Sequence, residues 1–245
     1  MTWHPDAVRA RDALKQALRE EFVPTLRAAG FKGTYPTWRL HTGDTVAVVT
    51  VLAGQYNEDT YGTFEVAMSI VTPAWKEWLE SEFSGGWYEP RKPGREQHWD
   101  GIARLTLTPL TRTNSLYDWM IDSVDDAKTV ARQMTEALDA GQLANLLRLT
   151  HPAELLADLD IINNLPPGEV HGYGWLWDGS GSQRAAIAHA VQLSEHGGPQ
   201  FDAACRRLEH PTSRFTGMTQ LEANTARWAR ARAARLAGER RALIS

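Results

Sequence analysis

The sequence has few of the features that mark secreted, membrane or disulfide-rich proteins. Its 245 residues include one cysteine, Cys205, which excludes an intrachain disulfide and favours a reducing compartment. The N-terminus has no basic cluster followed by an apolar run, and no segment approaches the roughly 18 consecutive apolar residues of a membrane span. We therefore expect a cytoplasmic protein that does not enter a membrane.

Reaction and metal motifs are lacking as well. The residues His189, His196, Cys205 and His210 are separated by 7, 9 and 5 positions, which matches no zinc pattern. Residues 168–182 include serine, histidine and aspartate, but they contain no nucleophile elbow, no dinucleotide fingerprint and no lysine. The sequence thus predicts no metal, no cofactor and no catalytic constellation, although an enzyme is not excluded.

Charge and composition further narrow the class of protein that this sequence can encode. The net charge of −4 argues against binding nucleic acid over the whole surface, which requires a basic face. Tryptophan is abundant, with 10 residues, and arginine far outnumbers lysine, as is typical of proteins encoded by GC-rich bacterial genomes. Hydrophobic and charged fractions of 42% and 23% are those of an ordinary globular protein.

Periodicity and turn residues predict an α+β fold. We expect an N-terminal helix interrupted near Pro24 and ended at Gly30, with Phe31 folding back on its last turn. A four-stranded antiparallel sheet is expected from residues 37–41, 45–53, 63–71 and 102–107. Covering helices are predicted after Pro73 and from a capping box at residues 123–126 to about residue 141.

The second half of the chain has a different character. Residues 142–162 and 184–240 have helical patterns, and a second capping box at residues 219–222 is predicted to open the terminal helix. We therefore expect an α+β domain over residues 1–148 and a helical annex over residues 149–245 that packs on it.

A series of short motifs runs through the first half of the chain in a fixed order. They are Leu26-x-x-x-Gly30-Phe31-Lys32, Trp38-Arg39, Gln55, Phe64-Glu65-Val66, Arg104-Leu105 and Leu116-Tyr117-Asp118-Trp119. The series resembles the bacterial family catalogued as domain of unknown function 4304, over roughly residues 10–148. One departure is Tyr56-Asn57-Glu58, where the family usually carries a basic residue and serine. The resemblance implies a fold and no activity.

Five residues are predicted to form a binding site: Arg39, Gln55, Trp87, Arg104 and Trp119. Guanidinium groups bind carboxylates and phosphates bidentately, and exposed aromatic rings stack on ligands or partner side chains. Two alternatives stay open: the arginines pair with Glu65 or Asp100 across the sheet, and the tryptophans belong to the core.

These features predict a non-catalytic binding protein of the bacterial cytosol. It would engage a protein partner through the sheet face and loops, as an immunity or accessory protein does. The alternative is an enzyme or ligand-binding domain that uses the same face for a small anionic or aromatic molecule. Binding of nucleic acid by the arginine-rich terminal helix ranks last, because the net charge is negative.

Overall fold

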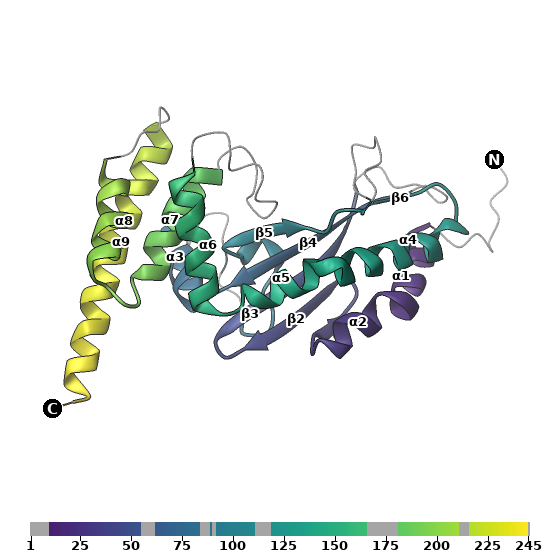
Figure 1. The fold of residues 1–245 in the computed structure, drawn as a ribbon, viewed down its shortest axis with the longest axis horizontal. Helices are drawn as coiled ribbons and strands as arrows, with labels where there is room; N and C mark the ends of the chain where they lie inside the picture. Colours follow the sequence, from purple (N-terminus) through teal and green to yellow (C-terminus); the bar gives the residue numbers. More distant parts are fainter. Residues whose placement is uncertain are drawn as a thin grey trace. The chain divides into compact units, whose positions relative to one another are not determined.

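A computed structural model describes residues 10–54, 62–83, 89, 92–110, 119–165, 181–210 and 216–244 (Figure 1). The chain divides into two compact units. The first, here called the α+β unit, comprises Met1–Ile70, Glu96–Trp99 and Arg104–Thr150. The second, the helical unit, comprises Val71–Arg95, Asp100–Ala103 and His151–Ser245. The packing of an annex on a domain that ends at residue 148 stays a prediction.

The predicted α+β class is confirmed. An antiparallel sheet is built from β1 (Lys32–Thr34), β2 (Thr37–Thr42), β3 (Thr45–Ala53), β4 (Gly62–Val71), β5 (Ala103–Thr106) and β6 (Trp119–Ile121). Its order is β1-β2-β3-β4-β5, and β6 also pairs with β4. The helical segments of the α+β unit are α1 (Ala10–Glu21), α2 (Val23–Ala28), α4 (Asp126–Ala137), the π-helical turn η2 (Leu138–Gln142) and α5 (Leu143–Arg148).

Within the described residues the sheet has six strands, where four were predicted. The two additional strands, β1 and β6, have three residues each, which is too short for an alternating pattern to identify. β1 pairs with β2 from Lys32 opposite Arg39 to Thr34 opposite Thr37, and the Tyr35-Pro36 turn joins them. β6 pairs with the start of β4, with Trp119 opposite Phe64.

The N-terminal helical region ends as the sequence predicted. Proline has no amide hydrogen and is tolerated only in the first helical turn, so α1 ends at Glu21 and α2 begins at Val23. Gly30 has a φ of 91°, and the amide of Phe31 donates to the carbonyl of Leu26 at 2.9 Å. This returns the chain to the sheet with Phe31 buried.

Helices α1 and α4 pack against each other, and Figure 1 shows the stretch from α4 to α5 crossing in front of the strands. The Thr135 hydroxyl of α4 donates to the carbonyl of Glu21 at 3.1 Å, and the Lys128 ammonium lies 3.5 Å from the Glu21 carboxylate. At the predicted capping box, Ser123 Oγ donates to Asp126 Oδ2 at 2.8 Å. The positive φ of Gly141, 112°, marks the predicted end of this helix, but α5 follows immediately.

The helical unit contains α3 (Pro73–Phe83), α6 (Pro152–Asn164), α7 (Gly181–Leu193), α8 (Pro199–Glu209) and α9 (Thr216–Ala242). The short helix η1 (His98–Asp100) has its first two residues in the α+β unit and its last in the helical unit. The prediction that residues 219–222 cap the terminal helix is wrong, because α9 begins at Thr216. Glu222 therefore lies within the helix and is buried. None of the helices in the described ranges is both long and apolar enough to cross a membrane.

One arginine links three parts of the helical unit. The side chain of Arg232 on α9 is only 7% exposed. Its guanidinium donates to Glu77 of α3 at 2.7 Å, to the Ser194 hydroxyl at 3.1 Å and to Glu195, just after α7, at 3.1 Å. The neighbouring Arg235 donates to Glu77 and Glu239 but is largely exposed. These arginines of α9 are thus engaged within the unit.

Substitution of Gly33 by alanine tests the β1–β2 connection. Gly33 has a φ of 125°, and an added Cβ would lie 2.5 Å from the Thr37 carbonyl oxygen. We expect Gly33→Ala to lower the free energy of unfolding by about 2 kcal/mol or more. Gly43→Ala is the control, because Gly43 has a φ of 58° with no atom within 4 Å of an added Cβ, and it should cost only about 1 kcal/mol. Equal urea midpoints for the two variants would contradict this.

Substitution of Arg232 by alanine tests the link within the helical unit. It leaves Glu77 and Glu195 without their shared cation and should cost about 2–3 kcal/mol, because charged hydrogen bonds from a buried donor are lost. Arg235→Ala, which removes an exposed and solvent-screened pair, should change thermal stability far less. The reverse order of Tm values would show that Arg232 does not hold these elements together.

Candidate functional site

The predicted binding residues are only partly covered by the structure. Gln55 and Trp87 lie outside the described residues. The backbone of Arg104 lies in β5, but its side chain is outside the described part. Only the side chains of Arg39 and Trp119 can be placed. The five residues therefore stay a prediction as a set.

Arg39 is engaged by a neighbouring segment. It lies on β2 with its side chain 14% exposed, and its Nε donates to the backbone carbonyl of Glu96 at 2.6 Å. The same nitrogen lies 3.8 Å from Glu96 Oε2. This pairing of an arginine with a carboxylate is of the kind weighed as an alternative from the sequence, and here the carboxylate of Glu96 is one partner.

Trp119 belongs to the core of the α+β unit. It is buried, and its indole N–H donates to the carbonyl of Leu107 at 2.9 Å. The indole rings of Trp38, Trp75 and Trp78 are buried too, whereas Trp99 is 44% exposed. Most of the tryptophans that the structure describes thus follow the core alternative.

A cleft of the α+β unit lies apart from these residues. A cavity of about 280 Å³, here called the basic cleft, is bounded by α1, α2, β1 and the start of β2. The side chains of Leu18 and Trp38 are buried beneath it. The charged residues among its described lining are all cationic: Lys15, Arg19 and Arg27.

Two of the three cations are held in place by neighbouring groups. Arg27 donates from Nη1 to the Phe31 carbonyl at 2.8 Å and from Nη2 to the Gly33 carbonyl at 2.5 Å. The Lys15 ammonium lies 5.8 Å from the centre of the Tyr35 ring, within cation–π range. Arg19 is exposed and forms no ion pair with any residue in the described ranges. Within the described ranges, the positive charge of the cleft is therefore not neutralised by direct pairing.

Tyr35 supplies an uncharged hydrogen-bond donor beside these cations. Burial raises the pKa of its phenol; the charge of Arg11 opposes this and that of Asp12 adds to it. The phenol therefore keeps its proton at neutral pH. Ammonium, guanidinium and phenol groups together can donate to a carboxylate or a phosphate.

The sequence contained a signal for this cleft that the motif analysis missed. Lys15, Arg19, Val23 and Arg27 recur every four residues and all line the cleft. Such spacing places side chains along one side of a helix. The contribution of Tyr35 could not be seen, because it depends on the short β1–β2 turn.

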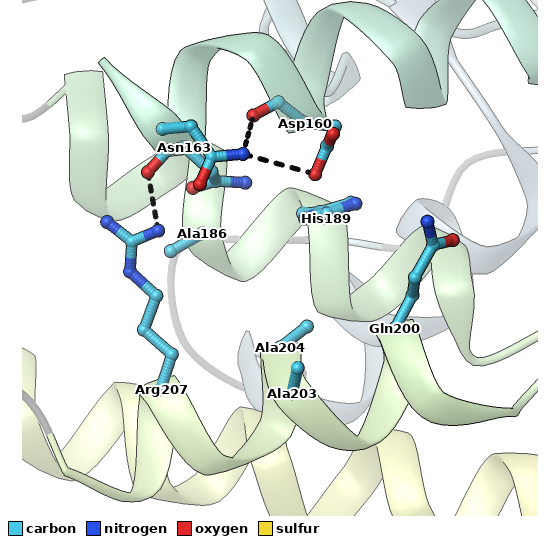
Figure 2. A pocket seen from close by; sticks show the side chains of 9 residues that line it. Asp160, Asn163, Ala186, His189, Gln200, Ala203, Ala204 and Arg207 are labelled. Atoms are coloured by element: carbon cyan, nitrogen blue, oxygen red, sulfur yellow. Dashed lines mark hydrogen bonds between the residues drawn. The ribbon is translucent and has the colours of Figure 1, made fainter.

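The helical unit has a second cavity, here called the polar pocket, of about 160 Å³ (Figure 2). It lies among α6, α7 and α8 and is lined by polar side chains over a base of alanines. His189 of α7 is half-buried, and burial lowers the pKa of its imidazole, with Arg207 acting in the same direction and Asp160 opposing. Within the described residues, no group of three or more His, Cys, Asp or Glu side chains could hold a metal ion.

Fold and cleft together define an α+β domain with an anion-attracting cleft on its helical side. The family model described as Domain of unknown function (DUF4304) matches residues 22–162. The match covers more than half of the chain, so the protein belongs to this family, and the resemblance predicted from the short motifs is confirmed. Searches of curated proteins and of solved structures gave no match.

Glu222 is a buried carboxylate that lines neither cavity. It is 5% exposed, its Oε2 accepts no hydrogen bond from the part of the chain that the structure describes, and burial raises its pKa above the usual value. The folded state therefore binds more protons than the unfolded state between the two pKa values. Stability is consequently lost as the pH rises through that window.

Substitution of Glu222 by glutamine removes this ionisation. We expect Glu222→Gln to raise the urea midpoint at pH 7, because the unpaired buried charge is gone. The gain should shrink as the pH falls through the window between the two pKa values and should be smallest below about pH 4, where the carboxyl is protonated in both states. A gain that is the same at every pH, or a loss at pH 7, would contradict this explanation.

Proposed function

We propose that this protein is a non-catalytic binding protein that receives an acidic segment of a protein partner in the basic cleft. One observation carries the proposal: Lys15, Arg19 and Arg27 line a single cleft, and none of its described lining residues is a carboxylate. A partner carboxylate would supply the missing counter-charge, and it would also accept from the phenol of Tyr35.

The geometry suits side chains rather than a large docked surface. Lys15 and Tyr35 are partly buried, so a carboxylate between them would be partly desolvated and its attraction to the ammonium would be less screened than at an open surface. The buried side chains of Leu18 and Trp38 beneath the cleft fix its walls. Charge complementarity of this kind speeds association and selects acidic partners over basic ones.

The wider setting is also part of the proposal. A single buried cysteine and an arginine-rich composition favour the bacterial cytoplasm, and an immunity or accessory protein is the concrete form we propose. The contact first predicted at Arg39, Gln55, Trp87, Arg104 and Trp119 is not needed for it. Arg39 already has Glu96 as a counter-charge, so the basic cleft is the stronger candidate.

A small anionic molecule is the second candidate. The cleft volume of about 280 Å³ favours it, because this is near the lower end of the range of roughly 300–1,000 Å³ that small-molecule sites occupy. Both candidates share the chemistry of a carboxylate or phosphate held by cations. They differ in which ligand binds the cleft more tightly, an acidic peptide or a free anion.

Charge reversal of Arg19 tests the proposal. The full chain should bind a short poly-glutamate peptide in calorimetry at low ionic strength. Arg19→Glu should weaken this binding at least about tenfold, because it places in the cleft a negative charge that repels the peptide. Arg132→Glu on α4 is the control, because its side chain is 63% exposed and lies outside the cleft. Both variants should keep the far-UV spectrum and Tm of the parent.

The outcomes separate the candidates. Peptide binding that Arg19→Glu weakens and Arg132→Glu does not supports the protein partner. Tighter binding of phosphate or citrate than of the peptide supports the small anion instead. No binding of any acidic probe, or stronger binding of a DNA oligonucleotide than of the peptide, would overturn the proposal.

A further inference from the structure

The polar pocket of the helical unit carries a second, independent inference. Its walls come from three successive helices, α6, α7 and α8, so its shape depends only on the packing within this unit. The base is made by Ala186, Ala203 and Ala204, whose small side chains leave the hollow. The alanines alone do not indicate what the pocket binds. The polar groups around them indicate which kind of ligand fits.

Several polar groups of the pocket lack protein partners within the described ranges. The Asp160 carboxylate accepts only from Asn164 Nδ2, at 3.4 Å, and forms no ion pair there. The ring nitrogens of His189 and the side-chain amide of Gln200 form no hydrogen bond with the described residues. Arg207 donates from Nη1 to the Asn163 carbonyl at 2.5 Å, which leaves Nη2 and Nε available.

Asn163 adds a buried acceptor. The residue is 6% exposed, and its Nδ2 donates to the Ala185 carbonyl at 3.4 Å. Its Oδ1 accepts no hydrogen bond from the described residues. A buried acceptor without a partner is costly, and such groups in native proteins usually face a water molecule or a ligand.

The opposite charges lie at different ends of the pocket. Figure 2 shows Arg207 and Gln200 at opposite ends of the α8 wall, with Ala203 and Ala204 between them. Asp160 and His189 lie together toward the Gln200 end, whereas Asn163 and Arg207 lie together at the other. One end therefore offers a carboxylate, and the other offers a guanidinium.

His189 does not weaken this separation of charge, because its imidazole is uncharged at neutral pH. Burial lowers the pKa of the imidazole, which is consequently neutral at pH 7. A neutral ring beside Asp160 adds no second cation at that end. It can accept from an ammonium group or donate to a neutral acceptor, depending on its tautomer.

We propose that the polar pocket binds a small zwitterion of the free amino acid class, with its ammonium toward Asp160 and His189 and its carboxylate toward Arg207. Each ligand charge then meets an opposite charge. Remaining ammonium hydrogens can be taken by acceptors such as the Gln200 carbonyl oxygen. A simple anion would meet Asp160 unfavourably, and a simple amine would meet Arg207 unfavourably.

The pocket volume limits the ligand. A cavity of about 150 Å³ holds benzene, which has six non-hydrogen atoms, so the 160 Å³ pocket suits a ligand of similar size. Glycine, β-alanine and γ-aminobutyrate bracket this size and vary the distance between the two charges. Propionate and propylamine each carry one of the charges alone.

Calorimetry of the full chain with these five compounds tests the proposal. At least one zwitterion should bind with a dissociation constant of about 1 mM or lower, and propionate and propylamine should bind at least about tenfold more weakly. Asp160→Asn and Arg207→Gln should each weaken zwitterion binding at least about tenfold, because each removes one counter-charge. Arg206→Gln is the matched control, since Arg206 adjoins Arg207 but does not line the pocket.

Folding is checked separately by Tm and far-UV spectra, because Arg207 also bonds to the Asn163 carbonyl. Asp160→Asn keeps the shape of the side chain and keeps an acceptor for Asn164, so it tests the charge even if Arg207→Gln is destabilised. Binding of propionate as tight as that of the zwitterions would overturn the proposal. So would zwitterion binding that Asp160→Asn leaves unchanged, or no binding of any zwitterion.

Discussion

The edge-to-face contact between Phe22 and Trp38, with ring centroids 6.0 Å apart, positions the basic cleft. Phe22 lies at the break between α1 and α2, and Trp38 lies on β2, so the contact ties both helices to the sheet. Both rings are buried, and Trp38 also meets Tyr35 edge to face. The stripe of cations on the two helices is thereby held opposite the β1–β2 turn. Loss of this packing would separate the donors that the proposed function requires.

The helical unit depends on polar contacts as much as on apolar packing. Arg232 joins α9 to α3 and to the end of α7, while the indole N–H of Trp78 donates to Thr225 and Gln192 donates to Thr72. Paired in this way, the buried polar groups specify which faces of the helices meet. They account for why an arginine-rich terminal helix need not be a nucleic-acid surface. The packing of α6, α7 and α8 in turn creates the polar pocket.

The sequence predicted the fold class well because its signals were local. Periodicity, Pro24, Gly30 and the apolar run of β3 identified most helices and strands, whereas β1 and β6 were too short to show a pattern. The sites depend on contacts between distant residues. Arg39 meets Glu96 57 positions away, and the polar pocket unites α6, α7 and α8 across more than forty positions, from Asn163 to Arg207. Only the four-residue spacing of Lys15, Arg19, Val23 and Arg27 could have been recognised from the sequence.

The proposed function requires that an acidic ligand binds in the basic cleft. The most direct measurement is a map of NMR chemical-shift changes in the isotope-labelled full chain on addition of the poly-glutamate peptide, at low salt and again at about 1 M salt, where the screening length is about 3 Å. We expect chemical-shift changes at the amides of Arg19, Gly33 and Tyr35 that vanish at high salt. Shifts centred on Arg39 and Trp119 instead, or none at low salt, would contradict it.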